Sequence, residues 1–298
     1  MFTRRHPYLF FLMVSATIAA VTVLGLTSLF MLGGERAEFD FGEKVGVVEV
    51  TGMIVDARDT IDQIKQLRED DTIKAIVVRI DSPGGAVAPS QEIYREIIKT
   101  VPQKKVVASM GAVAASGGYY IAAAADGIIA SPGTITGSIG VIMAYTNYRA
   151  LLDKIGLVPV VVKSGAYKDT GSPVREMTAE EREFLESLTD KIHQQFIQDI
   201  VAGRQMDSEK VSQLADGRIY TGEESKALGL VDRIGNIEDA IEWAGRMGGI
   251  EGQVSAVYVG EDEFSLLDYL LGSSLRTYLV RLLKGELAAE AVYRPGTN

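Results

Sequence analysis

Two runs of branched apolar residues constrain the fold of this chain more than any other feature. Residues 44–55 (KVGVVEVTGMIV) and 73–80 (IKAIVVRI) are largely apolar over their whole length rather than alternating. Such runs are typical of strands buried on both faces. Helical patterns lie between and after them, as expected when helices cover both sides of a largely parallel sheet. The sequence therefore predicts an α/β fold.

The other expected elements continue this alternation. Further strands are expected at residues 105–109, 127–130, 138–143 and 158–163. Helices are expected at residues 60–68, 89–100, 119–125, 147–155, 178–202, 211–214, 223–228 and 237–247, with a docking or membrane-surface helix at 265–283. Thr178 and Glu181 have the spacing of a capping box, which predicts that the longest helix begins there.

A segment near the N-terminus differs in composition from the rest of the chain. No charged residue occurs from Tyr8 to Leu32, and about 20 apolar residues suffice to cross a bilayer. Arg4 and Arg5 precede this segment, so the positive-inside rule places the N-terminus in the cytoplasm. The apolar stretch exceeds the roughly 7–15 residues of a cleaved signal peptide, which favours an uncleaved anchor. We expect a cytoplasmic N-terminus at residues 1–7, a transmembrane anchor at 8–32, a linker at 33–43, a catalytic domain at 44–253 and a C-terminal helical segment with a tail at 254–298.

Composition excludes several kinds of chemistry. The chain has no cysteine, so disulfides, a thiolate nucleophile and cysteine-ligated metals are impossible. A formal net charge of −10 argues against a nucleic-acid partner. The only histidines are His6 and His193, too few for a histidine-rich zinc site, and no HExxH motif is present. We therefore expect neither a metal nor a cofactor.

Ser116 is the candidate nucleophile. It lies in residues 109–122 (SMGAVAASGGYYIA), among small residues that would let a substrate backbone come close. A nucleophilic serine needs a general base and donors for the oxyanion. His6 would lie across the membrane, and His193 is interpreted as a solvent-facing or partly packed helix residue. A Ser-His-Asp triad is therefore disfavoured.

A neutral lysine remains as the possible base. Lysine titrates near about 10.4 in water, and burial lowers that value. Lys163 and Lys168 both lie in residues 158–170 (VPVVVKSGAYKDT). The residues alone do not choose between the two, and both could equally be surface lysines at the end of a strand.

Two glycine-containing turns could supply oxyanion donors. Residues 81–85 (DSPGG) follow an expected strand, and the amide of Gly85 is one candidate. The amide of Gly117, directly after Ser116, is the other. The alternative interpretation is that both are ordinary turn glycines.

Six motifs together resemble a known family. They are DSPGG at 81–85, SMGAVAASGGYYIA at 109–122, TGSIGVIM at 136–143, KSGAYKD at 163–169, SPVREMT at 172–178 and ADGRIY at 215–220. In this order they resemble the signal peptide peptidase A family in its short, single-domain form, membrane-bound Ser/Lys proteases with a ClpP/crotonase-like repeated β-β-α superhelix. The resemblance weakens after about residue 253.

The resemblance implies roles for individual residues. It makes Ser116 the nucleophile and Lys168, rather than Lys163, the general base. It places Gly85 in the oxyanion hole and gives Ser138 the role of orienting the lysine. Gly117 remains the second donor suggested by its position.

The resemblance also implies a function and an assembly. The chain would be a serine endopeptidase that hydrolyses remnant signal peptides through an acyl-enzyme, on the outer side of the bacterial cytoplasmic membrane. Its partners would be peptide substrates, membrane lipid and further copies of itself in a homo-oligomeric ring with an apolar interior. In this short form the serine and the lysine come from neighbouring subunits. A non-catalytic scaffold ring and a crotonase-like acyl-CoA enzyme are the alternatives.

Overall fold

The computed structural model describes residues 7–32 and 43–259, and these fall into two units divided after Gly42. The first unit contains helix α2 (Pro7–Leu32). Over the residues whose side chains are described, which in α2 are Tyr8 and residues 11–25, no helix is long and apolar enough to cross a membrane. The segment expected to be an anchor is thus helical, and its insertion into a membrane stays a prediction. The expected helix at 265–283 lies outside the described residues.

The second unit is built on one sheet. In its described part the strand order is β6-β5-β3-β2-β1-β8, with β4 pairing with β3 and β7. The strands are β1 (Lys44–Thr51), β2 (Ile73–Ser82), β3 (Lys105–Ala115), β4 (Gly127–Ala130), β5 (Ile135–Gly137), β6 (Ile219–Thr221), β7 (Arg233–Ile234) and β8 (Ser255–Tyr258). All the pairings are parallel except that of β5 with β6. The predicted mixed α/β fold is confirmed.

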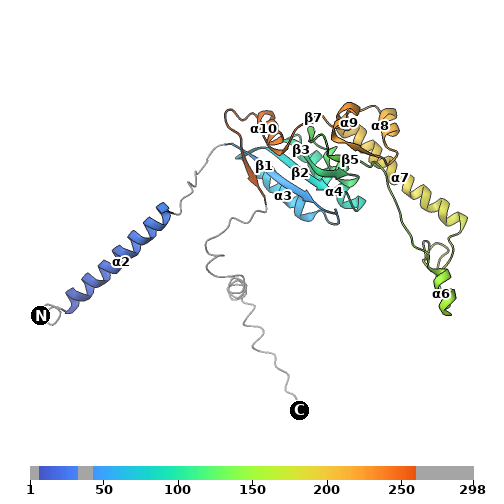
Figure 1. Ribbon diagram of the computed structural model, residues 1–298, viewed down its shortest axis with the longest axis horizontal. Helices are drawn as coiled ribbons and strands as arrows, with labels where there is room; N and C mark the ends of the chain where they lie inside the picture. The colour runs from blue at the N-terminus through green and yellow to red at the C-terminus, as the bar shows by residue number, and fades with distance from the viewer. Residues whose placement is uncertain (1–6, 33–42, 260–298) are drawn as a thin grey trace, which may run out of the picture. The chain divides into compact units, whose positions relative to one another are not determined.

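Both faces of the central strands are buried, as their apolar runs predict. Val45 and Val47 of β1 join one core cluster, together with α10 (Ile237–Met247), whereas Val48 and Val50 join the other. This alternation follows from the two-residue repeat of a strand. The second cluster is covered by α3 (Arg58–Glu69), α4 (Val87–Thr100) and α5 (Gly117–Ala122) (Figure 1).

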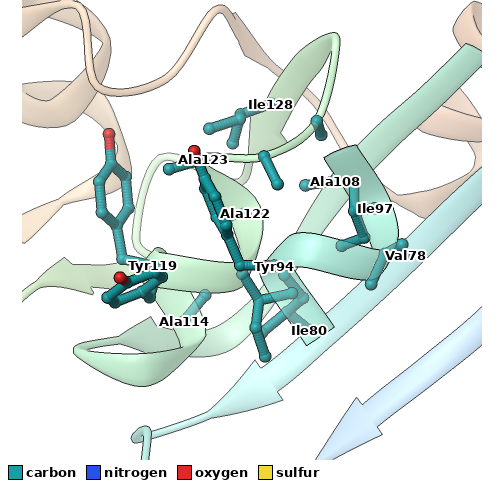
Figure 2. Close-up of a cluster of buried hydrophobic side chains, with 14 of the residues drawn as sticks. Val78, Ile80, Tyr94, Ile97, Ala108, Ala114, Tyr119, Ala122, Ala123 and Ile128 are labelled. Carbon is teal, nitrogen blue, oxygen red and sulfur yellow. The ribbon is translucent and has the colours of Figure 1, made fainter. Parts of the chain in front are cut away.

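The short helix α5 is embedded in the second cluster. Tyr119 and Ala122 of α5 and Ala123, which caps its C-terminus, are fully buried and gather with Ile80 of β2 and Ile97 of α4 (Figure 2). Small side chains allow this helix to lie close against the sheet. The turn between β3 and α5, which contains Ser116, is therefore held from both sides by packed core.

Two of the predicted strands are wrong. Residues 138–143 are irregular, because β5 has already ended at Gly137 and Ser138 has a left-handed φ of 50°. Residues 158–163 are irregular and exposed. A strand needs a neighbour for its backbone hydrogen bonds, and residues 158–163 have none among the described residues of this chain.

Residues 141–171 form an extended segment, here called the arm, which carries α6 (Arg149–Ile155) away from the sheet (Figure 1). The arm leads into α7 (Ala179–Arg204), and α8 (Ser208–Leu214) and α9 (Gly222–Leu228) follow. α7 begins after Thr178 with the predicted capping box, in which the side chains of Thr178 and Glu181 each accept the other's backbone N–H. That prediction is confirmed.

Candidate active site

Ser116 lies at the turn where β3 ends and α5 begins, in a strained backbone conformation. Its φ and ψ are 53° and −117°, a region that non-glycine residues rarely adopt. Such a conformation costs on the order of 1–3 kcal/mol and persists only where the surroundings enforce it. Here the Ser116 N–H donates to the carbonyl of Gly137 at 2.8 Å, and its carbonyl accepts from the Tyr120 N–H at 2.9 Å.

The DSPGG turn presses against Ser116. A Cβ added to Gly84, whose φ is +97°, would lie 2.6 Å from Gly117 N and 2.9 Å from Ser116 Cβ. A Cβ added to Gly85 would lie 2.1 Å from the carbonyl oxygen of Ile54. Both positions need glycine because neighbouring segments of the chain leave no room for a side chain. This explains the paired glycines of the motif.

The two predicted oxyanion donors lie close together. Gly85 N is 3.3 Å from the position that a Cβ on Gly117 would occupy. The backbone bridge between Ile54 and Gly85 is formed by the N–H groups of Ile54 and Ala86. The Gly85 N–H takes no part in it and has no acceptor among the described residues. Gly117 is the first residue of α5, where the helix offers its N–H no acceptor. Neither N–H is thus engaged by an acceptor in the described part of the chain.

Ser138 lies beside Ser116. It directly follows Gly137, whose carbonyl holds the Ser116 N–H, and its own N–H donates to the carbonyl of Arg218 at 2.8 Å. Within the described part of the chain, Ser116, Ser138 and Gln205 are the non-glycine residues with positive φ. Two of these three are serines assigned to the site from sequence.

A cavity of about 620 Å³ opens beside these groups. Its lining residues are Met53, Pro83, Gly84, Gly85, Val87, Ser116, Ser138, Gly140, Val141, Ile142, His193, Ala215, Asp216 and Gly217. The structure thus brings together Ser116, Gly85 and Ser138, three of the five predicted site residues. Gly117 lies behind the lining, in contact with Gly84.

Neither candidate lysine lines this cavity, because both belong to the arm. Lys163 Nζ lies 2.5 Å from Asp169 Oδ1 and donates to the carbonyl of Ala166 at 2.8 Å. Lys168 is exposed, and its ammonium group has no partner among the described residues. Within one chain, the predicted base is therefore separated from the predicted nucleophile.

The arm ends in a charged network next to Lys168. Arg175 Nε donates to Asp169 Oδ2 at 2.9 Å, and the Arg175 guanidinium also donates to both carboxylate oxygens of Glu181. Hydrogen bonds from Arg175, and then from Lys163, hold the pKa of Asp169 well below its usual range. The hydrogen bond from Arg175 lowers the pKa of Glu181 to about 2. This network joins the loop that carries Lys168 to the first turn of α7.

His193 is the cavity residue that sequence reasoning missed. It lies on α7 between the periodic apolar positions Ile192 and Phe196, which supports only the expectation of partial packing. No motif or spacing in the sequence marks it as a neighbour of Ser116. The two residues line one cavity because of the fold, in which α5 and α7 are in contact. Among the described residues, no group of three or more acidic, histidine or cysteine side chains could hold a metal ion.

Comparison with known proteins gives consistent matches. The model of peptidase family S49 matches residues 99–250, and the Clp protease model matches residues 47–134. A putative protease of Synechocystis sp. is 44% identical over 238 residues, covering 79% of this chain and 86% of the relative. A putative protease of Methanocaldococcus jannaschii is 32% identical, covering 92% and 91%. A putative signal peptide peptidase SppA of Enterococcus faecium is 35% identical, covering 74% and 70%.

Proposed function

Because this chain belongs to peptidase family S49 and is a serine endopeptidase, we propose that it is a membrane-anchored Ser/Lys enzyme that hydrolyses remnant signal peptides. Ser116 is the nucleophile, and Lys168 of a neighbouring copy is the general base. The observation that carries the proposal is the placement of Ser116, a strained residue at a strand–helix turn that lines a cavity of about 620 Å³.

The reaction is acyl transfer followed by hydrolysis. Ser116 Oγ attacks the scissile carbonyl carbon while its proton passes to the neutral amine of Lys168. The C–N bond then breaks, the lysine returns the proton to the leaving amine, and water hydrolyses the acyl-enzyme. The N–H groups of Gly85 and Gly117 stabilise the oxyanion; losing one such donor typically costs about 2.7–4 kcal/mol of transition-state stabilisation.

A second copy of the chain supplies the base in this proposal. The exposed position of Lys168 and the lack of a partner for its ammonium group fit a residue that completes a site elsewhere. Lys163 is already paired with Asp169, which supports Lys168 as the base. The hydroxyl of Ser138, beside Ser116 in the cavity wall, then receives and orients the incoming amine.

The arm carries the surface that would form a homo-oligomeric ring. Val158, Val160 and Val162 are 83%, 85% and 96% exposed. Other exposed apolar side chains of the arm and α7 are Ile142, Tyr145, Leu151, Ile155, Leu157, Phe184 and Leu188. An exposed apolar surface of this kind marks an interaction site. Burying it against another copy would also bring Lys168 towards a neighbouring Ser116.

The anchor and the substrate follow from α2 and from the relatives. α2 has 26 residues and no charge, a length of about 39 Å against a hydrocarbon core of about 30 Å. Because Arg4 and Arg5 precede α2, the catalytic unit lies outside the bacterial cytoplasmic membrane.

The name of the Enterococcus faecium relative suggests signal peptides as substrates. Such apolar segments suit the apolar parts of the cavity wall, including Met53, Val87 and Ile142.

Mixing two inactive variants tests the proposal. In detergent-solubilised full chain, we expect Ser116→Ala and Lys168→Ala each to abolish peptide hydrolysis, whereas Lys210→Ala, an exposed lysine of α8 outside the arm, retains it. Equal, randomly assembled mixtures of the two inactive variants should recover about one quarter of the wild-type sites, since each site then draws its two groups from different subunits.

Two outcomes would contradict the proposal. Full activity of either single variant would exclude that residue from the chemistry. Absence of recovery in verified mixed oligomers would show that both groups act within one subunit. Labelling of Ser116 by a fluorophosphonate would separately exclude a non-catalytic scaffold, and failure of calorimetry to detect coenzyme A binding would exclude the acyl-CoA alternative.

A further inference from the structure

One polar atom of the cavity wall has no role in the proposed reaction. His193 Nε2 is buried and has no hydrogen-bond partner in the described part of the chain. A buried nitrogen left without a partner costs on the order of 1–3 kcal/mol. Such an atom in a native structure calls for an explanation, and one explanation is a ligand that is absent from the free protein.

The other polar side chains of the wall already have roles or partners. Ser116 is the nucleophile and Ser138 the proposed partner of the lysine. Asp216 is held by the guanidinium of Arg218, which donates to both of its carboxylate oxygens. The remaining lining residues are apolar or glycine. His193 is therefore the side chain of the described wall that is left to recognise a polar group on a substrate.

The wall that contains His193 continues along α7. A second cavity of about 470 Å³ is lined by Arg182, Leu185, Glu186, Thr189 and Asp190, which lie on one face of this helix at three- and four-residue spacing. Ile142 lines both cavities. From Arg182 to His193 the helix rises about 16 Å, the length of about five residues of extended peptide. An extended substrate on this face would thus reach His193 and the cavity that Ser116 also lines.

We infer that His193 is a specificity-determining residue: its Nε2 pairs with a hydrogen-bonding substrate side chain that enters the cavity beside Ser116. This inference rests on the proposed role of Ser116. A site built around a polar group rejects an isosteric substrate that lacks the partner, because the buried polar atom then stays unpaired. The enzyme should therefore prefer threonine to valine, and glutamine to methionine, at the residue that supplies the scissile carbonyl.

Matched peptides test this inference. One peptide is made in Thr/Val and Gln/Met versions at that residue, and kcat/KM is measured for the full-chain wild type, His193→Leu, His193→Gln and the control Gln194→Leu. Gln194 is exposed on the same helix and does not line the cavity. We expect the wild type and Gln194→Leu to prefer the hydrogen-bonding peptides on the order of tenfold. His193→Leu should lose that preference, and His193→Gln, which keeps an amide at a similar reach, should retain most of it.

The possible failures are distinguishable. If Ser116 of the wild type is not labelled by a fluorophosphonate, the proposed function fails. If Ser116 is labelled and His193→Leu keeps the wild-type preference, only the role of His193 is overturned. A loss of kcat of more than about a thousandfold in both His193 variants, for all peptides, would instead make His193 a base and overturn the inference. If His193→Leu does not fold, His193→Gln provides the test instead. Equal kcat/KM values of this variant for the apolar and the hydrogen-bonding peptides would also overturn the inference.

Discussion

The site depends on residues that can adopt unusual backbone angles or come unusually close. Ser116 accepts a φ of 53° because β3, α5 and the carbonyl of Gly137 hold it there. Gly84 must lack a side chain because Ser116 and Gly117 occupy the space that a Cβ would fill. The motif DSPGG could be found from sequence, but its contact with Ser116 could not, because Gly85 and Ser116 lie 31 positions apart and only the pairing of β2 with β3 brings them together.

Gly84→Ala should damage the site more than the fold. The added Cβ would displace the turn from Ser116, and an error of about 1 Å at a reacting group can cost on the order of a hundredfold in rate. The positive φ adds about 1 kcal/mol or more of strain. The measurements are the rate of fluorophosphonate labelling of Ser116 and the thermal midpoint. Gly133→Ala is the control, since nothing lies within 4 Å of its added Cβ; equal labelling rates for the two variants would contradict the argument.

Among the helices and strands, short sequence patterns predicted an element correctly where its hydrogen bonds are formed within the same segment. The start of α7 was predictable because Thr178 and Glu181 form a capping box within four residues. The strand expected at 158–163 was wrong for the opposite reason. Its branched apolar residues favour an extended chain, yet the described part of the chain provides them no neighbouring strand. The network that connects Asp169, Arg175 and Glu181 was not predicted, since the formal charges in the sequence do not show which pairs meet.

Acid should weaken the start of α7. Glu181 has a folded pKa of about 2, lowered by Arg175, against about 4.3 in the unfolded chain. Its stabilising contribution is therefore complete above about pH 4.3 and is lost as the pH falls towards 2. We expect Glu181→Gln to lower the free energy of unfolding at pH 7 and this deficit to shrink as the pH approaches 2. Denaturant unfolding at several pH values measures it, with the exposed Glu183→Gln as control; a deficit independent of pH would contradict the role of the charge.

At the scale of the whole molecule, the sheet and the arm differ most in how far their apolar side chains are buried. β1, β2 and β3 have both faces covered by helices of the same chain, whereas the arm presents valines to solvent. Exposed apolar surfaces of this kind mark interaction sites. In the proposed ring the arm would be covered by a neighbouring copy, and the proposed active site would share this dependence because Lys168 lies on the arm.

Charges placed on the arm should dissociate the proposed oligomer without unfolding the sheet. Val160→Lys with Val162→Lys puts two ammonium groups into the proposed interface, and burying unpaired charge is strongly unfavourable. Sedimentation velocity should show smaller species and peptide hydrolysis should cease, while the thermal transition of the sheet persists. Glu209→Lys on α8, an exposed position outside the arm, is the control. An unchanged oligomer with full activity would show that these valines do not form the interface.

The sequence by itself determined the α/β class, a helix at residues 8–32 and the capped start of α7, and it predicted Ser116, Gly85 and Ser138 as members of one site. These features depend on local patterns or on motifs that a family resemblance could match. Only the tertiary structure decided that His193 lines the cavity, that Gly84 packs directly against Ser116, and that Lys168 lies away from Ser116 within one chain. Each of these depends on contacts between residues far apart in sequence, which packing of the whole sheet creates and no local pattern encodes. Ser116 was therefore predictable as a candidate nucleophile, but the separation of Ser116 from Lys168 was visible only once the arm was seen to leave the sheet.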